Sequence, residues 1–282
     1  MADSPKAAVY GLNINANPHP AGIYPVLLKQ IAKNIVQARG SDYAKITSPK
    51  QVPDRKDFYF GRILIWTDIN LKGRWLDLGE EDDLPDGIKQ AIKIPPNAKP
   101  NYRSFDYVLD EKSHQIWFET KNDLGYSLGP STARRIFSIL LSREVLGGNA
   151  PVVEVTVIPE KGAVDRILQL PRLQTLTIRV TRPNQDASSL AARNRVFQQL
   201  DDNHAQQLEL TLTKAPGSVK LTLTGEFEEL AKVGADTGLV RGEEITGNGE
   251  KNTLSTTQLP QRLYIDNTPG TSFFTRLLAK IV

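Results

Sequence analysis

The sequence predicts an α+β fold, in which helices pack against mixed sheets. Three observations support this class. Stretches in which apolar and polar residues alternate recur along the chain, as they do in half-buried strands. Other stretches place apolar residues at helical spacing. In the middle of the chain, residues 152–180 read as strand, helix and strand, which is typical of a βαβ-like unit.

The N-terminal elements are a strand, a turn and a helix. Residues 7–15 alternate as a strand does, and the prolines of residues 17–22 indicate a turn because each fixes φ and lacks an amide donor. Pro25 suits the first turn of a helix. Apolar residues continue at helical spacing to Ile35, and Gly40 is expected to end this helix.

Two strands and an acidic loop are expected next. Residues 43–47 and 58–67 are predicted strands, because they are rich in aromatic and β-branched residues. The stretch 76–86 contains no basic residue and is expected to be a solvated surface loop rather than a metal site. Its carboxylates are Asp77, Glu80, Glu81, Asp82, Asp83 and Asp86. Residues 85–100 are proline-rich and are expected to form a connector.

A β-hairpin over residues 102–121 and a helix that begins at Ser131 or Thr132 follow. The glycines at 147–148 are expected to end that helix, and they suggest an N-terminal α+β domain over 1–148 and a C-terminal one over 149–282, unless the two form one unit. The later elements expected are strands at 152–158, 173–180 and 219–223, helices at 164–170, 186–210, 226–233 and 273–278, and a hairpin at Asn248-Gly249.

Composition limits the chemistry that is available to the chain. The 282 residues contain 35 Lys and Arg, 32 Asp and Glu, three His and no Cys, which gives a formal charge of +3. Without cysteine there is no disulfide, thiolate nucleophile, iron–sulfur cluster or cysteine-ligated zinc, and we expect no cofactor. No apolar run is long enough to span a membrane and the N-terminus lacks a secretory signal, so we expect a cytoplasmic protein.

Sequence motifs for phosphate-binding loops and for serine-nucleophile elbows are absent. The predicted hairpin offers a weaker pattern, with Asp106 and Asp110 on one arm and Glu119-Thr120-Lys121 on the other. Because side chains repeat every two residues along a strand, Glu119 and Lys121 are expected on one face. With Asp110 they make the layout of a PD-(D/E)xK nuclease, in which carboxylates hold Mg²⁺. A solvent-facing cross-strand ion pair explains the same residues equally well.

Basic residues outnumber acidic ones between residues 129 and 182, and most of them are arginines. Guanidinium groups bind phosphate in a bidentate manner, so packing of these elements into one face would favour nucleic acid, with duplex DNA the expected partner. The alternative is that each arginine pairs with a nearby acid. The candidate nucleic-acid-binding residues are Arg134, Arg135, Lys161, Arg166, Arg172, Arg179 and Arg182.

Several strings resemble an uncharacterised bacterial family, the domain of unknown function DUF4747, over about residues 12–257. They are residues 17–24, 117–122, 128–137 and 172–184. The resemblance implies an accessory protein of prophages or phage-defence loci and transfers no catalytic residue. More remotely, the size and the Gly-Pro-Ser/Thr step before a helix are similar to the lambda RexA exclusion protein and the KwaB defence component, which implies DNA binding.

Three hypotheses follow. The first is an oligomeric, non-enzymatic protein of phage defence or prophage exclusion that binds nucleic acid and has no catalytic residue. The second is a Mg²⁺-dependent nuclease that uses Asp110, Glu119 and Lys121. The third is a scaffold or sensor that recognises a phage protein or a second defence-system protein.

Overall fold

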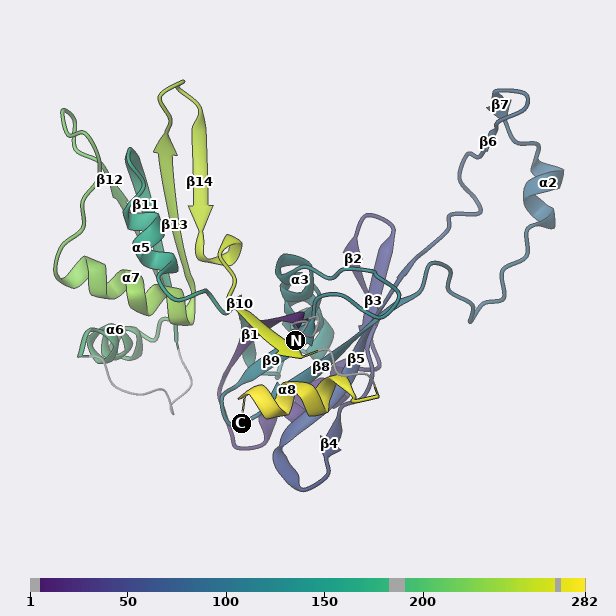
Figure 1. Cartoon of the computed structure of the whole chain (residues 1–282), viewed down its shortest axis with the longest axis horizontal. Coiled ribbons are helices and arrows are strands. Elements are labelled where there is room, and N and C mark those ends of the chain that lie inside the picture. Colours follow the sequence, from purple (N-terminus) through teal and green to yellow (C-terminus); the bar gives the residue numbers. More distant parts are fainter. Residues whose placement is uncertain (1–5, 183–190, 267–269, 282) are drawn as a thin grey trace, which may run out of the picture.

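The computed structural model describes residues 6–182, 191–266 and 270–281, and it confirms the α+β class. Two antiparallel sheets of nine and four strands account for most of the strands (Figure 1). The large sheet has the order β10-β1-β9-β8-β5-β3-β2, with β15 pairing with β1 and β4 pairing with β5. Its strands are β1 (Lys6–Asn17), β2 (Val36–Arg39), β3 (Asp42–Ile46), β4 (Lys50–Val52), β5 (Arg55–Thr67), β8 (Arg103–Asp110), β9 (Gln115–Glu119), β10 (Val152–Val157) and β15 (Arg262–Asp266).

Strand β1 organises the large sheet because it pairs with three other strands. Its residues Val9–Asn13 pair with β9 on one side. On the other side its first half, Lys6–Tyr10, pairs with β15, and its second half, Leu12–Asn17, pairs with β10. The C-terminal strand β15 therefore returns to the first strand of the chain.

Helices cover both faces of the large sheet. On one face lie α1 (Ile23–Ile31), α3 (Pro130–Leu140) and α4 (Arg143–Leu146), whose apolar residues join the main core. On the other face lies α8 (Phe273–Ile281), which buries Phe273 and Leu277 against Val9, Val108 and Trp117. The alternation of each strand divides its side chains between these two cores.

The small sheet, of order β12-β11-β13-β14, has a core of its own with the helices α5, α6 and α7. The chain enters this part after β10 and leaves it before β15. Its elements are α5 (Ala163–Leu168), β11 (Leu173–Thr181), α6 (Ala191–Asp202), β12 (Gln207–Thr213), α7 (Glu226–Thr237), β13 (Leu239–Ile245), β14 (Lys251–Ser255) and the 3-10 helix η1 (Thr256–Gln258).

Three asparagines of β1 join the two sheets. Their side-chain amides donate hydrogen bonds to the small-sheet part of the chain: Asn13 to the Asp236 carbonyl at 3.3 Å, Asn15 to the Arg182 carbonyl, and Asn17 to the Gln206 side chain at 2.9 Å. Since these positions are two residues apart, all three side chains leave the same face of the sheet. The contact between the sheets is therefore polar.

Several expected elements differ from the structure. The helix predicted to reach Gly40 ends at Ile31, because Val36 and Ala38 are buried alternately with exposed neighbours and form β2. Residues 219–223 form no strand. The helix predicted over 186–210 is α6 followed by β12, and its first residues lie outside the described ranges.

The strand–helix–strand order predicted for the middle of the chain is present as β10, α5 and β11. Its two strands belong to different sheets, and both pair antiparallel with their neighbours, so they are not a parallel crossover unit. The expected domain boundary after residue 148 falls between α4 and β10. Both β10 and β15 nevertheless pair with β1 in the large sheet.

A long excursion between β5 and β8 leaves the large sheet (Figure 1). It contains the short strand pair β6 (Leu76–Asp77) and β7 (Asp82–Asp83) and the helix α2 (Asp86–Ala91). We name residues 68–101 the acidic arm. Across the described ranges, none of the helices is long and apolar enough to cross a membrane.

Gly238 is expected to be sensitive to substitution, because a Cβ there would overlap the Arg179 carbonyl oxygen and lie 2.9 Å from its carbon. Backbone cannot move aside as a flexible side chain does. We predict that Gly238→Ala lowers stability by about 1–3 kcal/mol, measured by thermal unfolding followed by circular dichroism. Gly148→Ala is the control, since its Cβ meets no atom within 4 Å. Equal unfolding midpoints for the two variants would contradict the prediction.

Candidate functional site

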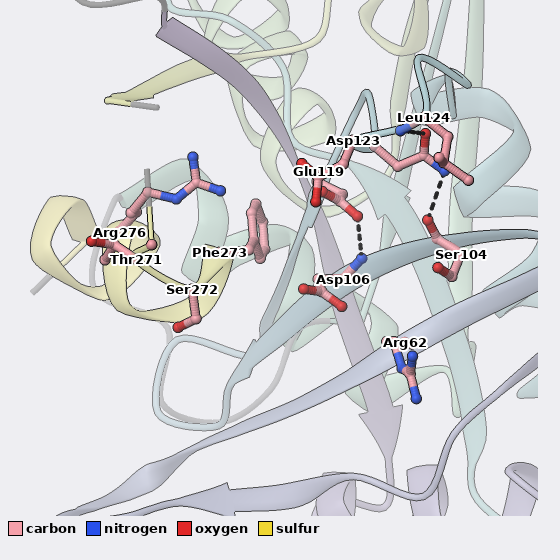
Figure 2. Close-up of a pocket in the computed structure, with 12 residues that line it drawn as sticks. Arg62, Ser104, Asp106, Glu119, Asp123, Leu124, Thr271, Ser272, Phe273 and Arg276 are labelled. Carbon is pink, nitrogen blue, oxygen red and sulfur yellow. Dashed lines mark hydrogen bonds between the residues drawn. The ribbon is translucent and has the colours of Figure 1, made fainter. Parts of the chain in front are cut away.

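A cavity of about 590 Å³ opens between the first turn of α8 and the strands β5, β8 and β9 (Figure 2). Five of the residues that line it carry ionisable carboxyl or guanidinium groups. Its lining residues are Arg62, Ser104, Asp106, Glu119, Asn122, Asp123, Leu124, Gly270, Thr271, Ser272, Phe273 and Arg276. Three carboxylates and two guanidinium groups thus share one polar pocket.

Sheet register places the central residues of this pocket next to one another. In the β8–β9 hairpin Tyr107 pairs with Phe118, so Asp106 and Glu119 come opposite each other one position further on. On the other side of β8, Arg62 of β5 pairs with Asp106. The Asp106 amide donates a hydrogen bond of 2.7 Å to Oε1 of Glu119, as the dashed line in Figure 2 shows.

The loop after β9 is shaped by Asn122. Its Oδ1 accepts hydrogen bonds from the amides of Leu124 at 3.1 Å and Tyr126 at 2.9 Å, and its Nδ2 donates to the Ser104 carbonyl at 3.1 Å. A side chain that bonds to amides two and four residues ahead fixes a compact turn. The turn carries Asp123 at the edge of the carboxylate pair.

The carboxylate pair holds protons unusually tightly. The pKa of Glu119 is raised to about 7, chiefly by burial and also by the charges of Asp106 and Asp123, while the Asp106 amide and Arg276 act in the opposite direction. Burial likewise raises the pKa of Asp106, although the Arg62 guanidinium opposes this shift. Near neutral pH, Glu119 is therefore divided between its acid and carboxylate forms. Such a group can donate or accept a proton.

The structure brings Glu119 together with Asp106 and not with Asp110. Asp110 lies about 13 Å further along β8 at the strand rise of 3.3 Å per residue, and its Oδ1 accepts hydrogen bonds from the amides of Lys112 and Ser113 in the turn. Lys121 is exposed beyond the end of β9 and does not line the cavity. Among the described residues, no group of three His, Asp or Glu is placed to hold a metal ion.

The cations predicted to bind nucleic acid come from several elements: α3, α5 and the residues before it, and both ends of β11. Arg172 precedes β11 and Arg182 follows it, so roughly 30 Å of strand separates them. Arg179 pairs with Glu209 at 2.8 Å and Arg182 with Asp201 at 2.7 Å. Arg166 pairs with Glu160, and with Lys161 it lines a separate cavity of about 490 Å³.

Arg134 and Arg135 lie on α3, among elements that the sequence did not group together. The helices α1, α3 and α4 cover one face of the large sheet, and β2 is a strand at the edge of that sheet. Residues 23–39 and 130–146 contain a single carboxylate, Glu144. The cations of these two stretches are Lys29, Lys33, Arg39, Arg134, Arg135 and Arg143, which we name the basic face. All of them are exposed except the half-buried Arg134.

The chain belongs to a family whose function is undefined. The model of the domain of unknown function DUF4747 matches residues 6–281, which is nearly the whole chain. The match extends through both sheets and α8, so the excursion into the small sheet is part of the family's own structure. No curated protein matches the chain.

Titration of Glu119 is expected to appear in the stability of the protein. Its pKa of about 7 in the folded chain lies above its ordinary value of 4.5, so the folded state binds the proton more tightly. The free energy of unfolding contributed by this group therefore falls as pH rises from 4.5 through 7. Glu119→Gln keeps the oxygen acceptor but cannot ionise. We predict that its stability relative to the wild type increases between pH 5 and pH 8, measured by urea unfolding.

The control is Glu250→Gln, at an exposed position far along the chain from the pocket. Its stability is expected to follow the wild type at every pH. A constant difference between Glu119→Gln and the wild type from pH 5 to pH 8 would refute the assignment of this titration to Glu119.

Proposed function

We propose that the protein binds nucleic acid, without cleaving it, as a cytoplasmic component of phage defence or prophage exclusion. The observation that carries the proposal is the basic face. Four exposed cations, Lys29, Lys33, Arg135 and Arg143, lie on α1, the link after it, α3 and α4, where Glu144 is the one carboxylate. Phosphates of duplex DNA are the partner that such a surface attracts, through charge neutralisation and release of counterions.

The cations of this surface are available to a partner. Within the described ranges, Lys29, Lys33, Arg135 and Arg143 make no salt bridge. The arginines of the small sheet differ, since Arg179 and Arg182 are already paired with carboxylates. A cation with a fixed carboxylate partner gains less from a phosphate, because the existing pair must be broken.

The phage-defence setting and the choice of DNA over RNA belong to this proposal, and they rest on the resemblance of the sequence strings alone. That resemblance identifies no contact residue. The residues that we propose to contact phosphate are the cations of the basic face, and a DNA-binding measurement tests them whatever the biological setting.

We predict that duplex DNA binds with an affinity that falls steeply with salt, and that Arg135→Ala/Arg143→Ala reduces the slope of log K against log salt by about 1.8, since each lost phosphate contact removes about 0.9. Fluorescence anisotropy with a labelled duplex between 50 and 300 mM salt measures the slope. The control is Lys161→Ala/Arg172→Ala, which removes two exposed cations outside the basic face. Absence of binding at low salt, or an equal loss in both double variants, would overturn the proposal.

A second candidate function is favoured by the Asp106–Glu119 pair. We propose it as hydrolysis of a phosphodiester that Arg62 and Arg276 help to bind. Ionised Glu119 would accept a proton from water as its oxygen attacks phosphorus, and the leaving oxygen would take a proton from solvent. This version replaces Asp110 with Asp106 and does not depend on Lys121.

We predict that, if this activity exists, Glu119→Gln lowers the rate of cleavage at least about 100-fold, the ordinary contribution of a general base, while duplex binding is unchanged. Cleavage of labelled single-stranded and duplex DNA is followed with and without Mg²⁺. Asp110→Asn is the matched control, because Asp110 lies in the hairpin turn and outside the pocket. Equal cleavage by the wild type and Glu119→Gln would exclude this role of Glu119.

A further inference from the structure

We propose that the acidic arm of one chain docks on the basic face of a second copy of the same chain. This inference goes beyond nucleic-acid binding, because it concerns an interface between copies and needs no nucleic acid. The arm has no core of its own and its tip is acidic and apolar, while the basic face has the opposite charge with apolar residues among its cations.

The acidic arm is held only at its base. There the Thr67 amide donates to the Pro100 carbonyl at 3.3 Å, and Lys99 pairs with Asp68 at 3.5 Å. None of the residues 68–101, all of which the structure describes, is buried. The arm extends away from the body of the large sheet (Figure 1). A two-stranded ribbon and a helix of six residues without a core are not independently stable.

Exposed apolar side chains stand out on the arm. Leu76 is 64% exposed, Leu78 is 84% exposed and Ile88 is 52% exposed. Leu76 begins β6 and Leu78 is the first residue of the β6–β7 turn, so both lie at this strand pair, which we call the tip. Apolar side chains that are exposed on a projecting segment, rather than scattered over a body, indicate a surface that becomes covered in an assembly.

The tip is also acidic. Arg74 pairs with Asp83 at 3.0 Å and Lys89 with Asp86 at 2.6 Å, so two of the arm's five cations are engaged there. Glu80, Glu81 and Asp82 make no salt bridge with any residue of the described chain. The arm therefore presents unpaired negative charge beside Leu76 and Leu78.

The basic face complements the tip in charge and in apolar character. Asp42 lies opposite Arg39 and Glu154 lies near Arg134, whereas Lys29, Lys33, Arg135 and Arg143 make no salt bridge with the described residues. Among these cations Val26 and Ile35 are 58% and 56% exposed. Val26 lies on α1 and Ile35 directly precedes β2. A carboxylate-rich tip with two leucines can thus pair ions with Lys29 and Lys33 while it covers both apolar residues.

The binding partner that we infer for the basic face is a second molecule of the same chain, because every copy carries both the acidic tip and the basic face. The same contact made reciprocally by two chains gives a closed, two-fold symmetric dimer in which each arm covers the other's basic face. Nucleic acid and the arm would then compete for the same cations. The arm is in this respect a polyanion that the protein itself supplies.

Sedimentation velocity of the full chain in 50 mM salt, without nucleic acid, tests the docking. The expected result is a dimer that dissociates in 500 mM salt. Leu76→Ser/Leu78→Ser, Glu80→Lys/Glu81→Lys and Lys29→Glu/Lys33→Glu should each weaken dimerisation by about tenfold or more. Combining the two charge reversals in one chain should restore the dimer. The control is Val219→Ser, since Val219 is 82% exposed outside both surfaces.

A monomeric wild type at 100 µM, or a dimer that survives the arm variants or the Lys29/Lys33 reversal, would overturn the docking. Fluorescence anisotropy of the arm variants with labelled duplex DNA separates a failure of the docking proposal from a failure of the nucleic-acid-binding proposal. Their basic face is intact, so Leu76→Ser/Leu78→Ser should bind duplex DNA at least as tightly as the wild type, whereas a protein that does not bind nucleic acid shows no signal in either form.

Discussion

The pairing of β1 with three strands is the constraint on which the rest of the structure depends. Since side chains alternate along it, Leu12, Ile14 and Ala16 enter the main core while Val9 enters the core under α8. On that second face, the asparagines of its C-terminal half hold the small sheet. A one-residue shift in its register would exchange these faces and place asparagine amides in the main core. The three asparagines of β1 are thus explained by their hydrogen bonds to the small-sheet part of the chain.

The periodicity of apolar residues predicted most of the helices and strands. It did not predict the register between strands or which side chains meet across them. The 102–121 hairpin and its turn were predicted correctly, because alternation in both arms is regular. That Glu119 faces Asp106 rather than Asp110 depends on how the turn closes, which alternation does not specify. The helix expected to reach Gly40 failed for a related reason, since Val36 and Ala38 suit a helical stripe and a strand equally. Arg134 and Arg179 belong to elements of different sheets, yet both act on the Glu154 carboxylate of β10, a juxtaposition that no local pattern predicts.

Charge distribution over the fold has a simple basis. The helical cover of the main core contains cations almost without acids, the arm tip contains acids of which only some are paired with cations of the arm, and the pocket under α8 holds both signs together. The formal charge of +3 is a sum over the whole chain, so it does not reveal these local concentrations of positive and negative charge. The separation suits recognition of polyanions and of the chain's own arm. The mixed pocket, with a carboxyl group of pKa about 7, suits proton transfer.

The pocket is assembled from segments that are far apart in the chain. Asp106 and Glu119 are brought together by a local hairpin, whereas α8 joins them only after the excursion through the small sheet. Residues 270–273 and Arg276 form one wall of the cavity that Asp106 and Glu119 line. The two carboxyl groups therefore belong to the hairpin in sequence and to the contact with α8 in environment, so changes in the packing of α8 are felt at a site more than 150 residues earlier in the chain.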